Sequence, residues 1–109
     1  HNPRCSKSRQ TLKLLQDHAV DIDVVEYLKE PPNAGQLTRI LDLLGLEPRQ
    51  LMRTGEAAYK DNNLADDDLS REALIDAMVA NPILIERPIV IAGDRARIGR
   101  PPESVLEIL

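Results

Sequence analysis

The sequence predicts an α/β fold in which helices flank a mixed sheet. The chain has 109 residues, of which 42% are hydrophobic, and this suits one compact domain over residues 1–109. Segments with helical periodicity alternate with short β-branched runs in the order helix, strand, helices, strand, strand, helix. The last two strands are separated by Gly93-Asp94, a pair that favours a tight hairpin turn. We therefore expect a layered single domain.

The first helix is expected directly after Cys5. Ser6 or Ser8 can serve as its N-cap by accepting a backbone hydrogen bond. Its apolar positions recur at a helical period, at Leu12, Leu14, Leu15 and Ala19. The next segment, residues 22–28, is short, β-branched and partly alternating, and it ends before a pair of prolines. It is predicted to be a strand.

The middle of the chain is predicted to be helical. Asn33 can cap a helix that ends at Gly45, and Pro48 suits the first turn of a short helix that follows. A polar stretch comes next and is expected to be mainly a loop, with a helical turn near Tyr59. Ser70 then begins another helical pattern. These segments interrupt the strand pattern and form a helical block.

The last part of the chain is predicted to form a hairpin followed by a helix. The two antiparallel strands are Ile89–Ala92 and Arg95–Ile98. The final run, PPESVLEIL, is amphipathic and ends without a helix stop signal. The chain also does not begin with Met, and no strand precedes Cys5. We therefore expect the sequence to be trimmed at both ends, with a first strand in the full protein.

Composition excludes several classes of function. With 18 acidic and 14 basic side chains the net charge is −4, which argues against broad attraction to a phosphate backbone. The chain has no Phe or Trp and only two Tyr, so base-stacking platforms are not expected. A single cysteine cannot form an internal disulfide, and no apolar run approaches the roughly 20 residues of a membrane span. We expect a cytoplasmic protein with no nucleic-acid or membrane partner.

The one cysteine lies in an unusual stretch. Cys5 is surrounded by Arg4, Lys7 and Arg9 at the expected start of a helix. A helix N-terminus and nearby cations lower the pKa of a thiol, and the thiolate is the nucleophilic form. The same backbone N–H groups and basic side chains suit an oxyanion beside the sulfur. The sequence thus indicates an activated nucleophile with an anion site.

An inert role for Cys5 remains open at this point, as a small buried hydrophobe beside a solvated basic turn. Ser8 stands where a Cys-x-x-Cys pair would have its second thiol, so turnover would need an external thiol. His1 is close enough in sequence to influence Cys5, although an isolated histidine is more often structural. No metal site is expected, because one cysteine and two histidines without ligand spacing do not form a zinc site.

Three separated segments resemble one family, the glutaredoxin-coupled arsenate reductases, which have a thioredoxin-like fold with a helical insertion. The segments are HNPRCSKSR, LMRTGEAAYKDNNL and NPILIERPIVIAGDRARIGRPPESVLEIL, and they occur in the same order as in the family. By composition alone Arg53, Arg87 and Arg100 look like surface residues. The resemblance implies that they bind the oxyanion, and that Cys5 is the catalytic nucleophile that forms a thiol-arsenate adduct.

The resemblance also assigns supporting roles and partners. It implies that His1 keeps the thiol ionised, that Ser8 hydrogen-bonds the sulfur, and that the Arg87–Pro88 peptide is cis. The expected substrates are arsenate and glutathione, the expected protein partner is glutaredoxin, and no bound cofactor is expected. Lys7 departs from the small residues that often follow the cysteine in the family, and it adds charge beside the anion site.

Two other functions fit the same fold. One is a redox-responsive regulator that binds RNA polymerase, although the paired cysteines usual in such sensors are absent. The other is a thiol-dependent reductase of a different substrate, such as a glutathione mixed disulfide.

Overall fold

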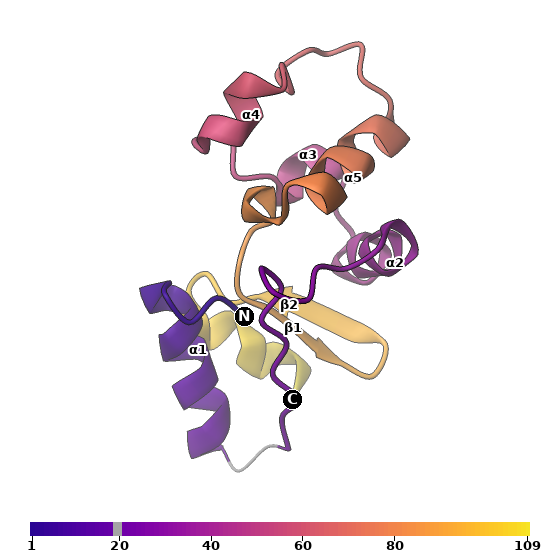
Figure 1. Ribbon diagram of the computed structural model, residues 1–109. Coiled ribbons are helices and arrows are strands. Elements are labelled where there is room, and N and C mark those ends of the chain that lie inside the picture. Colours follow the sequence, from indigo (N-terminus) through magenta and orange to yellow (C-terminus); the bar gives the residue numbers. More distant parts are fainter. Residues whose placement is uncertain (19–20) are drawn as a thin grey trace. The chain divides into compact units, whose positions relative to one another are not determined.

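The computed structural model describes residues 1–18 and 21–109 and resolves two compact units. The first unit comprises His1–Glu30 and Arg87–Leu109, and the second comprises Pro31–Glu86. Figure 1 shows the elements of both units along the chain. The prediction of a single domain over residues 1–109 remains a prediction.

The first unit combines helix α1, a hairpin and a terminal 3₁₀ helix. Helix α1 spans Ser6–Asp17, strands β1 and β2 span Ile89–Ala92 and Arg95–Ile98, and η2 spans Pro102–Ile108. The strands are antiparallel as predicted, with Gly93 at a φ of 62° in the turn. Helix η2 contacts both α1 and β2, and it buries Val105 completely. These contacts form the apolar core of the first unit.

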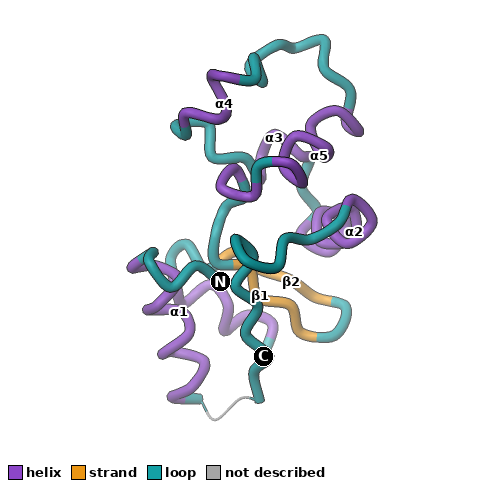
Figure 2. The backbone as a smooth tube through the Cα atoms, viewed as in Figure 1, coloured by secondary structure: helices purple, strands orange, loops and turns teal. Residues whose placement is uncertain are grey.

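The strand predicted over residues 22–28 is wrong. This segment has no strand structure, and Figure 2 shows it as loop. A strand requires a ladder of backbone hydrogen bonds to a neighbour. The backbone nitrogen of His1 donates to the Val25 carbonyl oxygen at 2.9 Å, but no partner strand runs beside the segment in the part of the chain that the structure describes.

The expected N-cap of the first helix needs correction. The N-cap of α1 is Cys5 itself, which makes no side-chain capping hydrogen bond, so neither Ser6 nor Ser8 caps the helix. The helix expected from the final amphipathic run is present and is a 3₁₀ helix, η2. Ala19, expected at the end of the first helix, lies outside the described residues.

The second unit is helical, as predicted. Its helices are α2 Ala34–Leu44, α3 Pro48–Leu51, α4 Ala57–Asp61 and α5 Arg71–Ala80, followed by the 3₁₀ turn η1 Pro82–Leu84. Helix α5 packs against α2, α3 and η1 around fully buried side chains of Leu37, Leu41, Leu51, Met78 and Leu84.

The helix ends of the second unit follow the predicted capping. Asn33 forms a capping box with Gln36, Gly45 ends α2 with a φ of 68°, and Ser70 caps α5 through the Ala73 N–H. Because each cap satisfies backbone groups that the helix itself leaves unbonded, these local signals suffice to set the boundaries.

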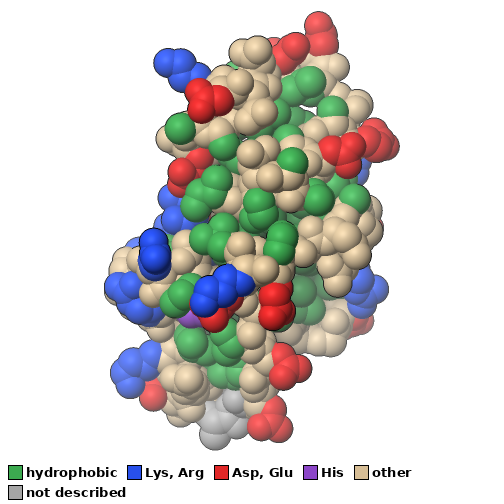
Figure 3. Space-filling model, in the orientation of Figure 1, with side chains coloured by type: hydrophobic (Ala, Val, Ile, Leu, Met, Phe, Trp, Pro, Cys, Tyr) green, Lys and Arg blue, Asp and Glu red, His purple; other side chains and the backbone are tan. Residues whose placement is uncertain are grey.

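The surface carries charges of both signs. Acidic and basic side chains share the face shown in Figure 3, in keeping with the net charge of −4. No helix within residues 1–18 and 21–109 combines the length and the apolarity needed to cross a membrane.

Gly99 joins the hairpin to helix α1 in the first unit. Its N–H donates to the Pro88 carbonyl oxygen at 2.9 Å. A Cβ atom at this position would lie 2.5 Å from Thr11 Oγ1 and 2.8 Å from Pro88 Cγ. Thr11 cannot easily turn away, because it is buried and its hydroxyl donates to the Lys7 carbonyl oxygen. Only glycine fits here without displacement.

We predict that Gly99→Ala lowers the free energy of unfolding by about 1–3 kcal/mol, the usual cost of overpacking. Gly55→Ala is the matched control, since nothing lies within 4 Å of its Cβ position. Chemical denaturation measures both variants. The cost of Gly99→Ala should shrink in a Thr11→Ala background, which removes the two Thr11 side-chain atoms of the clash and leaves Pro88 Cγ. An equal cost in the two backgrounds would contradict this account.

Candidate functional site

Cys5 stands at the N-terminus of α1 because a tight turn precedes it. The Cys5 N–H donates to the Asn2 carbonyl oxygen, and the Arg4 N–H donates to Asn2 Oδ1, both at 3.0 Å. Asn2 is buried, so this turn is fixed against the unit. With Cys5 as N-cap, its sulfur lies near the backbone N–H groups of Lys7 and Ser8, which lower the pKa of the thiol. The thiol therefore occupies the anion-binding end of a helix of 12 residues.

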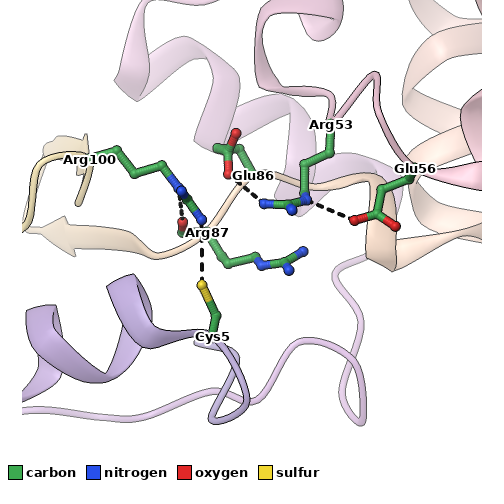
Figure 4. A network of polar contacts seen from close by, with 6 residues as sticks. All are labelled: Cys5, Arg53, Glu56, Glu86, Arg87 and Arg100. Carbon is green, nitrogen blue, oxygen red and sulfur yellow. Dashed lines mark hydrogen bonds and ion pairs between the residues drawn. The ribbon is translucent and has the colours of Figure 1, made fainter.

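Two arginines from the two ends of the hairpin reach the same sulfur. The β1–β2 register pairs Ile89 with Ile98, and continuing it outward sets Arg87 opposite Arg100. Arg100 Nη2 lies 3.4 Å from Cys5 Sγ, and the Arg87 guanidinium lowers the pKa of the same thiol. Arg100 Nε also donates to the Arg87 carbonyl oxygen at 2.7 Å (Figure 4). The predicted cis peptide at Arg87–Pro88 is confirmed, and Arg100–Pro101 is cis as well.

These contacts change the acidity of the thiol. Partial burial raises the pKa of Cys5. The Ser8 N–H, the Arg87 guanidinium and the Lys7 N–H lower the pKa, and together they outweigh the effect of burial. The net effect is a pKa below the ordinary value of a cysteine. The thiolate is thus favoured, as a nucleophile requires.

The positive charge that acts on the thiol comes mainly from a distant part of the sequence. The side chains of Arg4, Lys7 and Arg9 are exposed, and Arg9 Nη1 donates to the Pro3 carbonyl oxygen at 2.9 Å. Lys7 contributes to the sulfur through its backbone N–H. The guanidinium that lowers the pKa of Cys5 is that of Arg87.

His1 and Ser8 contact each other. His1 Nδ1 and Ser8 Oγ are 2.7 Å apart, and Ser8 Oγ also accepts the Asn2 N–H at 3.0 Å. The Ser8 side chain is fully buried, so this arrangement is fixed. Ser8 reaches the sulfur through its backbone N–H, while its hydroxyl joins His1 to the turn before Cys5.

Arg53 belongs to the second unit, where two carboxylates bind it. Its Nε lies 3.0 Å from Glu56 Oε1, and its Nη1 lies 3.1 Å from Glu86 Oε1 (Figure 4). The Arg53 N–H donates to the Leu84 carbonyl oxygen, and the Glu86 N–H donates to the Leu51 carbonyl oxygen. These backbone bonds hold Arg53 and Glu86 on adjacent segments. Sequence reasoning did not identify either carboxylate.

The whole chain matches known proteins. Residues 1–108 match the model of the ArsC family. The chain belongs to the ArsC family. It is 59% identical over 110 residues to the Escherichia coli K12 protein YfgD, covering 100% of this chain and 92% of that protein. It is 49% identical over 110 residues to a Haemophilus influenzae protein named arsenate reductase, covering 100% of this chain and 95% of the relative.

A solved structure supports the fold of this ArsC-family chain. The arsenate reductase of Vibrio cholerae is 52% identical to it, with a TM-score of 0.98 over 100% of this chain and 93% of that one. The thioredoxin-like α/β fold class predicted from the sequence is thereby confirmed.

One further residue of this ArsC-family site escaped sequence reasoning. Tyr27 is buried, and it acts to raise the pKa of the Arg87 guanidinium. The signal that could have found it is its rarity, because the chain has only two tyrosines and no other aromatic side chain apart from histidine. The other tyrosine, Tyr59, accepts a hydrogen bond from Arg49 Nη1 at 2.9 Å.

Metal ligands do not gather at this site. Within residues 1–18 and 21–109, no three His, Cys, Asp or Glu side chains form a group that could hold a metal ion. The chemistry that the site offers is therefore that of its thiolate, its backbone N–H groups and its guanidinium groups.

The lowered pKa of Cys5 predicts the pH dependence of its alkylation. Because only the thiolate reacts, the rate should reach half its maximum below the value of about 8.5 that is usual for a free cysteine. Arg87→Ala should move this midpoint to higher pH, since both a hydrogen bond and a charge are lost. Iodoacetamide kinetics from about pH 5 to about pH 10 would measure both profiles.

Arg97→Ala is the matched control for this measurement. Arg97 lies in the same hairpin, but its Nε binds Glu107 at 3.0 Å. Its removal should leave the midpoint unchanged. A midpoint that moves equally in both variants would refute a specific contact between Arg87 and the thiolate.

Proposed function

We propose that this protein is an arsenate reductase in which Cys5 is the nucleophile and glutathione and glutaredoxin supply the reductant. The observation that carries the proposal is the Cys5 sulfur at the N-terminus of α1, which Arg100 Nη2 contacts at 3.4 Å and whose pKa is lowered by two backbone N–H groups and the Arg87 guanidinium. The names of relatives such as the Haemophilus influenzae arsenate reductase support the choice of substrate.

The chemistry begins with attack of the Cys5 thiolate on the arsenic atom of arsenate. An S–As bond forms and an oxygen leaves as water after protonation, which gives a thiol-arsenate adduct. A glutathione thiol then forms a disulfide with Cys5. The S–As bond breaks and its electron pair passes to arsenic, which is reduced by two electrons to arsenite. A glutaredoxin thiol removes glutathione from the mixed disulfide and restores the Cys5 thiol.

Arg87 and Arg100 suit the oxyanion role because a planar guanidinium donates paired hydrogen bonds to tetrahedral anions. The adduct carries its negative oxygens beside the sulfur that both arginines already contact. Lys7 adds an exposed positive charge on the first turn of α1. Each cation stabilises negative charge that persists through the attack.

His1 and Ser8 are assigned supporting roles in this proposal. Their hydrogen bond ties the first residue to α1, and the Ser8 N–H contacts the sulfur. They therefore support the thiolate by holding the helix start in place.

Arg53 is proposed as the third oxyanion ligand on the strength of the family resemblance. Its guanidinium already donates to Glu56 and Glu86. Bound arsenate would have to use the remaining N–H groups or displace a carboxylate. The two carboxylates also outweigh the single positive charge of Arg53, so they oppose the approach of a dianion.

We expect arsenate-dependent oxidation of glutathione in the presence of glutaredoxin, followed as NADPH consumption through glutathione reductase. Cys5→Ser should abolish turnover, because a serine hydroxyl neither ionises at neutral pH nor forms a disulfide. Its thermal unfolding midpoint should stay near that of the wild type. Absence of wild-type turnover, combined with no protection of Cys5 from alkylation by arsenate, would refute the proposal.

A glutathione mixed disulfide should be assayed beside arsenate. The carboxylates around Arg53 are the observation that favours this alternative substrate, because they reduce the positive charge offered to an anion. Faster turnover of the disulfide, with none of arsenate, would assign the protein to that reaction.

Arg53→Ala tests the third ligand. We expect the KM for arsenate to rise about tenfold, since loss of one charge-assisted contact is worth about 1.4 kcal/mol in binding. Arg71→Ala is the control, as Arg71 is another arginine of the second unit with two acidic partners, Asp42 and Glu47. Unchanged KM values in both variants would leave Arg87 and Arg100 as the only arginine ligands of this proposal.

A further inference from the structure

Helix α1 begins in a different way from helix α2. In α2 the N-cap Asn33 accepts the Gln36 N–H at 2.8 Å, so its side chain occupies a donor of the first turn. In α1 the N-cap is Cys5, whose side chain makes no capping hydrogen bond. The first N–H groups of a helix have no partner within the helix, so those of α1 stay available to a group beside them.

Asn2 stabilises this helix start from three residues upstream of Cys5. Its carbonyl oxygen accepts the Cys5 N–H and its Oδ1 accepts the Arg4 N–H, both at 3.0 Å. Asparagine favours the first position of such a turn, because its side chain can accept a backbone N–H two residues on. The Asn2 N–H donates to Ser8 Oγ, also at 3.0 Å. The turn before Cys5 is therefore closed twice and joined to α1.

Burial holds this arrangement within the first unit. Asn2 is only 5% exposed, and the Ser8 side chain is fully buried. A buried amide needs hydrogen-bond partners, and Asn2 Oδ1 has one in the Arg4 N–H. We propose that Asn2 is a positioning residue, which holds Cys5 at the N-cap of α1 and leaves the first N–H groups of the helix to the sulfur and to an anion beside it. The proposal deepens the function proposed above and rests on Cys5 being its nucleophile.

An oxygen acceptor at the N-cap position itself would compete with the thiol. An asparagine, aspartate or serine there accepts an N–H group of the first turn, which is then lost to the sulfur or to an oxyanion. Asn2 avoids this competition, because its two oxygens accept the N–H groups of Arg4 and Cys5, which precede the helix. Loss of the Asn2 side chain should therefore loosen the placement of Cys5 without removing any donor of α1.

The test compares Asn2→Ala with Asn33→Ala. Each variant removes a side-chain oxygen that accepts a backbone N–H near a helix start, in the first unit and in the second unit respectively. For Asn2→Ala, the rate of Cys5 alkylation by iodoacetamide at pH values below the midpoint should fall about threefold, the change that follows from a pKa higher by about half a unit. The rate at high pH, where all the thiol is ionised, should change little. Asn33→Ala should keep the wild-type profile, although it also loses a helix cap.

Two further measurements separate positioning from a general loss of structure. Asn2→Ser should give a smaller decrease in rate, because a serine hydroxyl closes the same kind of turn more weakly. Amide hydrogen exchange of Cys5, whose N–H donates to the Asn2 carbonyl oxygen, should become faster in Asn2→Ala. Exchange within α1 should stay near its wild-type rate.

A wild-type alkylation profile for Asn2→Ala would overturn the proposal, and so would an equal shift of the midpoint in Asn33→Ala. If Asn2→Ala does not fold, Asn2→Ser decides, and a wild-type midpoint with unchanged exchange of the Cys5 amide would contradict the proposal. These measurements use no arsenate, so failure of arsenate turnover would count against the proposed function and not against this inference.

Discussion

The attraction between the Cys5 thiolate and the Arg87 guanidinium is the interaction on which the candidate site depends. It links residues from the two ends of the sequence within one compact unit. Burial of the sulfur opposes ionisation, and the pKa falls only because N–H donors of the helix start and a guanidinium charge act together. Helix α1 supplies the first contribution, and the hairpin supplies the second.

The packing of the first unit serves to maintain this contact. Gly99 lets the end of β2 approach Thr11 of α1, and its N–H bonds to the Pro88 carbonyl oxygen. The residues on either side of this contact, Arg87 and Arg100, then lie at the sulfur. A small residue in the hairpin is therefore tied to the chemistry of a thiol that is far away in sequence.

The arginines singled out by the family resemblance differ in the contacts that the structure gives them. Arg100 Nε donates to the Arg87 carbonyl oxygen, and Arg100 Nη2 lies 3.4 Å from the Cys5 sulfur. Arg53 binds two carboxylates, so its positive charge is locally compensated. A carboxylate partner reduces the attraction of a cation for an oxyanion.

Much of the local structure follows from the sequence. Asn33, Gly45 and Ser70 set helix ends through hydrogen bonds or backbone conformations that involve only nearby residues, and Gly93 sets the hairpin in the same way. The strand expected over residues 22–28 was wrong because a strand depends on a partner, which β-branched composition cannot supply. The expected serine caps of α1 failed because Cys5 occupies the N-cap position, while the Ser8 hydroxyl binds His1 and the Asn2 N–H.

The sequence by itself determined the position of Cys5 at a helix start and, through the family resemblance, singled out the three arginines. It indicated that the charges of Arg4, Lys7 and Arg9 surround the thiol, because they are its neighbours along the chain. Only the tertiary structure decided that Arg87 supplies the charge that lowers the pKa of Cys5, that Arg100 reaches the sulfur, and that carboxylates bind Arg53. The physical reason is that electrostatic interactions weaken with distance in space, and the separation of two residues along the sequence does not give their distance in space.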